Sequence, residues 1–319
     1  MEGTFNNDPS IGFWPTTSLR VMRGFGIPTE DLWPYDGDAS HWPPKSEPTN
    51  IDHFAKQHRI FAYQRVRDSQ ECKLVLASKN CPIVAVEITA SWFDAEQGQI
   101  HLPRSNEAII GSHSVTLAGY DDSKGSFIFR NSWGVKWGDK GYGYLPYEYL
   151  DLLVLEGLFI HLNYDSPRQA STSRHVEFQW SRKSILNGVL HGIELQDNRS
   201  DDRIAWTFAV AYDGFLNVEE FFIMPSHRHQ GHSKMLFQSL LTLSNRLSLP
   251  LRVWISHADS EDDNMRAILH LAQTHNLQVS NPSVRWASFM LLNGGTRGLN
   301  PIPRIRPGVS FPSRNTLPI

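Results

Sequence analysis

Cysteine is scarce in this sequence. Only Cys72 and Cys81 occur among the 319 residues. Small domains that depend on disulfides carry more cysteines than this, at regular spacings, so a disulfide framework is excluded. We interpret both cysteines as structural, because an isolated cysteine often behaves as a small buried apolar residue.

Long apolar runs and an excess of charge are lacking too. The longest apolar stretch, 152–160, is interrupted by Glu156 and is too short to span a bilayer. The first residues lack the basic start and apolar core of a signal peptide, so we expect a cytoplasmic protein without a membrane partner. The formal net charge of -3 provides no global basic field, so a nucleic-acid partner is not expected.

The composition that remains is that of a globular protein. Hydrophobic residues make up 40% and charged residues 20% of a chain whose length suggests about two domains. A small, polar stretch over 163–174 predicts a linker, and a segment rich in Gly, Pro and Arg from Asn293 onward predicts a tail. We therefore divide the chain into domains 1–165 and 166–292 and a tail 293–319.

Hydrophobic periodicity predicts α+β structure in both domains. In the first domain we expect a mostly antiparallel sheet, with helices at 17–23 and 70–78 and strands at 61–66, 83–88, 113–120, 126–131 and 141–146. In the second we expect a mixed, mostly antiparallel sheet, with helices at 231–247 and 262–274 and strands at 190–195, 204–212, 218–224, 251–256, 277–279 and 285–292.

His113 and Asn131 flank a predicted β-hairpin. The turn residues 121–125 contain the midpoint between them, so the two residues are expected to be nearly opposite on adjacent strands. An asparagine oxygen can accept an imidazole N–H and fix the tautomer and orientation of the ring, as the third group of a catalytic triad does. Trp133 follows closely and could shield the pair from water.

The same residues lie in two motifs. Gly111-Ser-His113-Ser-Val-Thr-Leu-Ala-Gly-Tyr120 and Arg130-Asn131-Ser-Trp133-Gly134-Val-Lys-Trp137-Gly138 closely resemble the papain-like cysteine peptidases, as does the segment 12–37. The resemblance covers about residues 10–162. It implies a papain-like β-rich half-domain in which His113 is the general-base partner, Asn131 orients it and Trp133 packs over them.

In that family the nucleophilic cysteine begins a long helix that precedes the segment matching 12–37, with an oxyanion-hole glutamine just before it. Here no cysteine precedes Cys72 and no glutamine precedes Gln57. We therefore expect a peptidase region that is inactive as it stands, or one whose nucleophile segment is missing from this sequence. The missing helix would leave apolar surface open, which a polypeptide that completes the fold could cover.

A second candidate site joins a predicted strand to a helix. In the run Ile223-Met-Pro-Ser-His-Arg228-His-Gln-Gly231-His-Ser233, Gly231 permits a close backbone approach, and the following helix offers unpaired N–H groups to a phosphate. Arg228 and Lys234 add positive charge. His227, His229 and His232 show no tetrahedral spacing with other ligands, so we expect an exposed histidine-rich loop and no metal.

This run resembles the acyl-CoA-binding motif of the GNAT acetyltransferases. The resemblance covers about 188–292, with Asn264-x-x-Ala267 matching the family's second cofactor helix. It implies that acetyl-CoA lies between strands 218–224 and 251–256, with an amine as acceptor. The residues implied in cofactor binding are Ile223, Arg228, His229, Gln230, Gly231, His232, Ser233, Lys234 and Asn264.

The catalytic residues for acetyl transfer are less defined. Glu219 and Glu220 are candidates for the base, and since side chains alternate along a strand, at most one of them should face the cleft. Leu271 stands where the family has its usual tyrosine acid, with His270 beside it. Residues 166–189 are too few for the first strand and the two helices that often form a wall of the acceptor site in that family.

Three functions remain open at this stage. The first is a fusion of a papain-like region, inactive as it stands, with an N-acetyltransferase that uses acetyl-CoA. The second is a cysteine peptidase whose nucleophile segment is not in this sequence. The third is a non-catalytic module that binds peptides and acyl-CoA.

Overall fold

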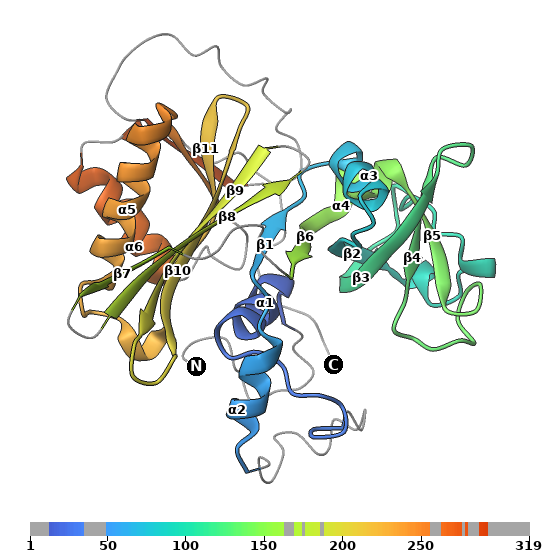
Figure 1. Ribbon diagram of the computed structural model, residues 1–319. Coiled ribbons are helices and arrows are strands. Elements are labelled where there is room, and N and C mark those ends of the chain that lie inside the picture. Colours follow the sequence, from blue (N-terminus) through green and yellow to red (C-terminus); the bar gives the residue numbers. More distant parts are fainter. Residues whose placement is uncertain are drawn as a thin grey trace.

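Two β-sheets organise the chain (Figure 1). The computed structural model describes residues 13–34, 49–162, 169–173, 176–185, 188–255, 263–275, 278–279 and 287–292. The first sheet has the strand order β1-β6-β2-β3-β4-β5, and the second has the order β13-β14-β12-β11-β10-β9-β8-β7.

The first sheet is antiparallel throughout. Its strands are β1 (Ala62–Arg65), β2 (Ile83–Thr89), β3 (Ile109–Asp121), β4 (Ser126–Arg130), β5 (Tyr142–Pro146) and β6 (Val154–His161). The helices of this half are α1 (Pro15–Gly24), α2 (Ile51–Ala55), α3 (Ser69–Ala77) and α4 (Tyr147–Leu153). Asp68 caps α3, because its carboxylate accepts the backbone N–H of Glu71 at 2.7 Å. Residues of α3, α4 and five strands enclose one apolar core.

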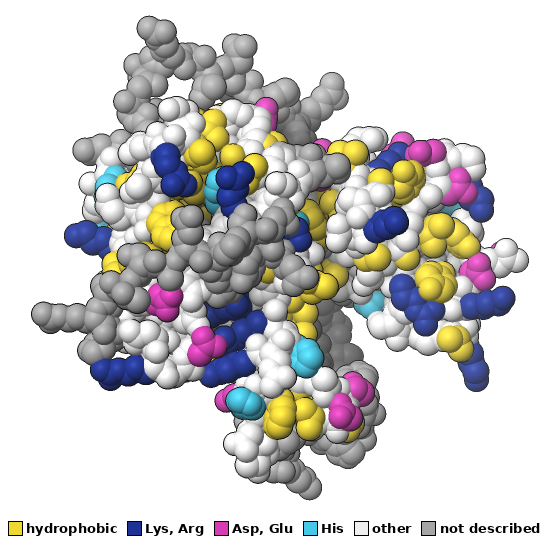
Figure 2. Space-filling model, in the orientation of Figure 1, with side chains coloured by type: hydrophobic (Ala, Val, Ile, Leu, Met, Phe, Trp, Pro, Cys, Tyr) yellow, Lys and Arg dark blue, Asp and Glu magenta, His cyan; other side chains and the backbone are white. Residues whose placement is uncertain are grey.

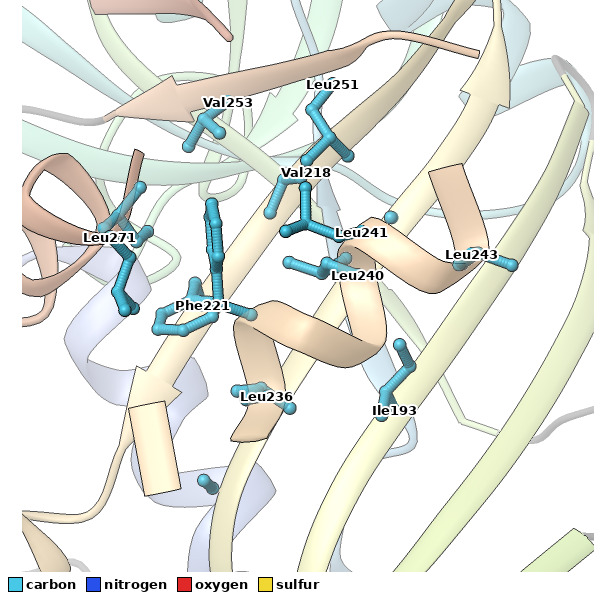
Figure 3. Packing of buried hydrophobic residues seen from close by; sticks show 14 of the residues in the cluster. Ile193, Val218, Phe221, Leu236, Leu240, Leu241, Leu243, Leu251, Val253 and Leu271 are labelled. Carbon is cyan, nitrogen blue, oxygen red and sulfur yellow. The ribbon is translucent and has the colours of Figure 1, made fainter. Parts of the chain in front are cut away.

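The second sheet is antiparallel except between β11 and β12. Its strands are β7 (Gln169–Ser173), β8 (Val176–Ile185), β9 (Gly188–Asp197), β10 (Arg203–Tyr212), β11 (Phe215–Ile223), β12 (Leu251–Ile255), β13 (Gln278–Val279) and β14 (Ala287–Leu292). Helices α5 (His232–Leu247) and α6 (Asp263–Thr274) pack on one face of this sheet. Figure 3 shows Leu236, Leu240 and Leu243 of α5 over Val218 and Ile193 of the strands.

The opposite face of the second sheet is covered by the first half of the chain. Leu19 of α1 and the segment 60–63 share a core with Trp206, Phe208 and Phe222. Glu156 of β6 accepts the backbone N–H of Thr16 at 3.0 Å and so holds the beginning of α1. Helix α1 and the edge strand β1 of the first sheet therefore lie against the second sheet (Figure 1).

The structure contains all the predicted helices and strands, with ends that differ by a few residues. The linker prediction is wrong over 169–173, because these residues form β7 and pair with β8. Elements α2, α4, β6, β7 and β8 were not expected. The predicted tail 293–319 lies outside the described residues, and the domain boundaries stay predictions.

The surface carries side chains of both charges. On the face seen in Figure 2, acidic and basic side chains are interspersed. Among the described residues, no helix is long and apolar enough to cross a membrane.

Candidate functional site

His113 and Asn131 are hydrogen-bonded to each other. His113 lies in β3, opposite Val86 of β2, and Asn131 directly follows β4. The distance between His113 Nε2 and Asn131 Oδ1 is 2.8 Å. Asn131 is buried, and its backbone N–H donates to the carbonyl of Gly141 at 2.9 Å, which anchors it to the segment before β5.

The register of the hairpin differs from the expected one. Thr116 pairs with Arg130, and a bulge between Leu117 and Gly119 shifts the pairing. Extending this register places Asn131 opposite Val115, so Asn131 is a diagonal neighbour of His113 and not its direct partner. The two residues are thus offset by two positions from a direct pair, and their side chains meet as expected. The bond still forms, because diagonal side chains on one face of a sheet remain within reach of each other.

The bond determines the tautomer of His113. The oxygen of Asn131 also accepts the backbone N–H of Ser132 at 2.8 Å, so the atom that faces both groups is an acceptor. His113 Nε2 must then carry the proton and donate it. The other ring nitrogen, Nδ1, is left with a lone pair that can accept a proton from a nucleophile.

Aromatic rings enclose the imidazole. Trp133 stacks on His113 with ring centroids 4.7 Å apart, and Phe93 stacks on the outer face of Trp133 at 5.0 Å. Trp92 approaches His113 edge-on at 6.3 Å. Trp92 and Phe93 were not identified from the sequence, because they follow β2, remote from both motifs.

Hydrogen bonds hold the buried rings in place. The indole N–H of Trp137 donates to the carbonyl of Trp92 at 2.8 Å, and that of Trp92 donates to the Tyr149 hydroxyl at 2.9 Å. The Tyr149 hydroxyl donates in turn to the carbonyl of Glu87 at 2.8 Å. The walls around His113 are thus tied to both β2 and α4.

The two cysteines lie away from this pair. Cys72 is on the buried face of α3. Burial raises the pKa of its thiol, which disfavours the nucleophilic thiolate. Cys81 is exposed and lies five residues before Val86, the strand partner of His113. At about 3.3 Å per residue along an extended chain, that separation is about 16 Å.

Four exposed apolar side chains belong to the segments that carry the pair and its aromatic cover. Ile109 and Ile110 begin β3, Phe93 covers Trp133, and Val135 lies within the asparagine motif; their exposed fractions are 41%, 45%, 55% and 67%. We call these four residues the apolar collar. The expected partner polypeptide stays a prediction.

The second candidate site has the predicted strand–turn–helix form. Ile223 ends β11 and is buried, a turn follows over Pro225–His227, and α5 begins at His232. Gly231 precedes the helix with φ +84, a left-handed conformation that favours glycine. No side chain caps the first turn of α5, so its N–H groups are available to an anion.

The histidines of this loop are not all exposed, contrary to expectation. His229 is exposed, whereas His232 is 8% exposed, and its Nδ1 is buried with no hydrogen-bond partner. Burial, with a smaller effect of nearby His227, lowers the pKa of His232 and so favours the neutral ring. Within the described part of the chain, no cluster of three potential metal ligands occurs.

Strands β11 and β12 are joined over only part of their length. Their parallel pairing runs from Leu216 with Leu251 to Val218 with Val253, and β11 continues beyond it to Ile223. The implied cofactor position, between these two strands, coincides with the part of β11 that pairs with no described residue of β12.

The two base candidates are buried in ion pairs. Glu219 Oε1 lies 3.3 Å from Arg67 Nη2, and Glu220 Oε1 lies 2.9 Å from Arg20 Nη2. Glu220 also accepts the hydroxyl of Tyr63 at 2.6 Å. Both carboxylates therefore face α1 and β1, so the alternation of side chains, from which at most one was expected to face the cleft, does not hold at these two residues. Neither is positioned to take a proton from a solvent-borne amine.

The structure describes fewer side chains in α6, the helix that was expected to complete the acyl-CoA site. Asn264 lies in α6, and its side chain is outside the described part. Leu271 is buried in the core under α6, and His270 is exposed.

Comparison with known proteins identifies the first half of the chain. Residues 4–149 match the family model for the papain family cysteine protease. An uncharacterized peptidase C1-like protein of Acanthamoeba polyphaga mimivirus is 28% identical over 153 residues, which are 45% of this chain and 49% of that protein. Cathepsin K of Mus musculus is 29% identical over 138 residues, 42% of this chain and 40% of that protein.

Among solved structures, the cysteine protease xylellain from Xylella fastidiosa is similar. It is 29% identical with a TM-score of 0.44, and the match covers 48% of this chain and 62% of that one. The match spans only about half or less of the length of the two curated relatives. Residues 4–149 are thus a papain-family cysteine peptidase region.

Proposed function

We propose that this papain-family region is the general-base half of a cysteine-type peptidase. The observation that carries the proposal is the 2.8 Å bond between His113 Nε2 and Asn131 Oδ1 beneath Trp133. In this arrangement Nδ1 of His113 accepts the proton of a thiol. The Asn131 oxygen then stabilises the imidazolium through the same Nε2–H bond, and the surrounding indoles limit competition from water.

The nucleophile comes from a segment other than the two cysteines of this sequence. Cys72 is buried with its thiol protonated, and Cys81 lies about 16 Å along the chain from the strand partner of His113. The thiol-bearing polypeptide docks on the apolar collar, beside His113. The substrate is a peptide amide. The thiolate attacks its carbonyl carbon, the C–N bond breaks, and the leaving amine takes the proton from His113 Nδ1. Water then hydrolyses the acyl-thioester to release the acid and restore the thiol.

Joining the chain to the cysteine-bearing half of an active papain-family enzyme tests this function. The fusion should hydrolyse a fluorogenic peptide amide, and alkylation of the introduced cysteine should abolish the activity. His113→Ala should remove it, and Asn131→Ala should reduce it about 100-fold or more, as the loss of a general base and of its orienting group does.

The matched control is Ser114→Ala, which changes an exposed neighbour in β3. A folded fusion that does not hydrolyse the peptide would overturn the peptidase proposal. If the unmodified chain then binds the same peptide with an affinity that depends on His113 and Trp133, the region is a non-catalytic peptide-binding module.

We propose a second function for the second half of the chain: binding of acetyl-CoA, with transfer of the acetyl group to an amine. Two observations favour it. The uncapped first turn of α5 follows a left-handed glycine, and the last residues of β11 before that turn pair with no described residue of β12. In this proposal the pyrophosphate contacts the amides from Arg228 to Ser233, with Lys234 nearby and the pantetheine arm between the strands.

The proton acceptor for this transfer is a group other than Glu219 and Glu220. Both are held in buried ion pairs, so protonating either would remove a buried negative charge from beside its arginine. An ordered water can take the proton of the amine instead, because in acetyl transfer water often relays the proton to the base.

Thermal unfolding with increasing acetyl-CoA tests the second function. At about 100 times its dissociation constant, a bound ligand adds about 2.7 kcal/mol to the free energy of unfolding. Gly231→Glu should abolish the shift. Gly214→Glu is the matched control, because Gly214 has a similar positive φ and open surroundings at the hairpin between β10 and β11. The absence of any shift in the unaltered chain would overturn acyl-CoA binding.

A further inference from the structure

Strand β11 contains a β-bulge at Glu219. In the pairing with β10, Phe208 faces Glu220 and Ala209 faces Val218, so Glu219 is an extra residue in β11. Val218 and Phe221 point toward the α5 side and belong to its core, as Figure 3 shows. The two carboxylates between them both point to the opposite side. The bulge thus breaks the usual alternation of side chains and turns the strand.

The parallel pairing of β11 with β12 ends at the residue just before this bulge. Bulges bend and twist the strand that carries them, so the departure of β11 from β12 begins where the bulge begins. We call residues 219–223 of β11, which pair with β10 but with no described residue of β12, the open segment.

The bulge is held from the first half of the chain. Arg67 contacts the carboxylate of Glu219, and the backbone N–H of Arg65 donates to the same carboxylate at 3.2 Å. Arg20 and Tyr63 contact the carboxylate of Glu220. Both glutamates are almost completely buried, so their charges depend on these partners for stabilisation in the interior.

We propose that Arg20, Tyr63 and Arg67 are positioning residues for the open segment, so that the papain-family half forms a structural part of the acyl-CoA site. This rests on the second proposed function. Removing one partner leaves a buried carboxylate short of a hydrogen bond, and the bulge must shift to find another. Ligand binding at the open segment and the packing of β1 and α1 against it then stabilise each other, because such a coupling is reciprocal.

Two variants of the full-length chain test the proposal. Arg67→Met removes the guanidinium and keeps most of the apolar length, and Tyr63→Phe removes only the hydroxyl. The control is Lys56→Met, because the Lys56–Asp202 ion pair also joins the two halves, at 2.7 Å, but does not involve β11. Arg67→Lys tests rescue by a conservative change.

Two readouts are measured on each folded variant. The dissociation constant for CoA, from calorimetry, should rise about tenfold in Arg67→Met and Tyr63→Phe, and less in Arg67→Lys. Hydrogen exchange of the amides in 219–223 should accelerate in the first two variants. Both quantities should stay unchanged in Lys56→Met.

The outcomes separate the two proposals. If the unaltered chain does not bind CoA, the acyl-CoA function is overturned, while exchange in 219–223 still decides whether the first half holds the open segment. If Arg67→Met and Tyr63→Phe are folded with unchanged exchange and unchanged CoA affinity, the positioning role is overturned.

Discussion

His113 donates its Nε2–H to the side-chain oxygen of Asn131, although the two residues are diagonal neighbours across a bulged hairpin. The bulge between Leu117 and Gly119 sets this relationship. The aromatic stack above the ring then restricts His113 to one orientation, with Nδ1 directed away from Asn131.

The tautomer of His113 is the first prediction. Nitrogen-15 NMR at a pH where the ring is neutral should show the Nε2–H form, because the oxygen of Asn131 only accepts. Asn131→Ala should produce a mixture of the two tautomers. An Nδ1–H form in the unaltered chain would contradict the proton path from a thiol to Nδ1.

The packing beneath the site supplies a second prediction. A Cβ at Gly143 would lie 2.3 Å from a ring carbon of Phe129 and 2.8 Å from one of Trp137, so Gly143→Ala should destabilise the chain by about 1–3 kcal/mol or more. Gly119→Ala is the control, because its new Cβ would meet nothing closer than 3.7 Å. Urea denaturation measures both. Equal stability of the two variants would show that the region beneath Trp137 relaxes freely.

A third prediction concerns the buried charges between the halves. Glu194 pairs with Arg23, and its Oε2 atom also lies 3.5 Å from Arg203 Nε. Arg23 is buried against the rings of Trp206 and Phe208. Glu194→Gln removes the negative charge from two buried arginines and should cost about 3–5 kcal/mol. Lys56→Met, which breaks an exposed pair between the same halves, should cost less than about 1 kcal/mol. A loss in Glu194→Gln no larger than in Lys56→Met would contradict this assignment.

The fourth prediction is a pH dependence. Burial, with smaller effects of Arg182 and Arg246, lowers the pKa of His191 from 6.5 to about 4. The unfolded chain therefore binds more protons than the native one between these values, so stability should fall as the pH is lowered from 6.5 to about 4.

His191→Gln should lose this part of the pH dependence while keeping the part due to carboxylates. The difference between the two denaturation curves, measured across the same pH range, isolates the histidine. Parallel curves would show that His191 titrates normally in the folded state.

Local patterns in the sequence were sufficient for several features. The leucines of α5 recur with helical spacing, so its amphipathic face and its packing on a sheet follow from the chain alone. His113 and Asn131 lie in two motifs separated by a short turn, and that turn folds the two strands back on each other so that the residues meet. The polar strand β7 escaped prediction, because a small polar composition is as typical of a linker as of an edge strand.

Tertiary structure alone decided the remaining features. Glu219 and Glu220 look like alternating residues of one strand, and only the pairing with β10 reveals the bulge that turns both toward the first half. Their partners Arg20, Tyr63 and Arg67 lie more than 150 positions away in the sequence. The sequence by itself determined most of the helices and strands and the His113–Asn131 pair, because those depend on near neighbours. The packing of α1 and β1 on the second sheet, and the charges buried there, depend on contacts between remote segments, which only the folded chain brings together.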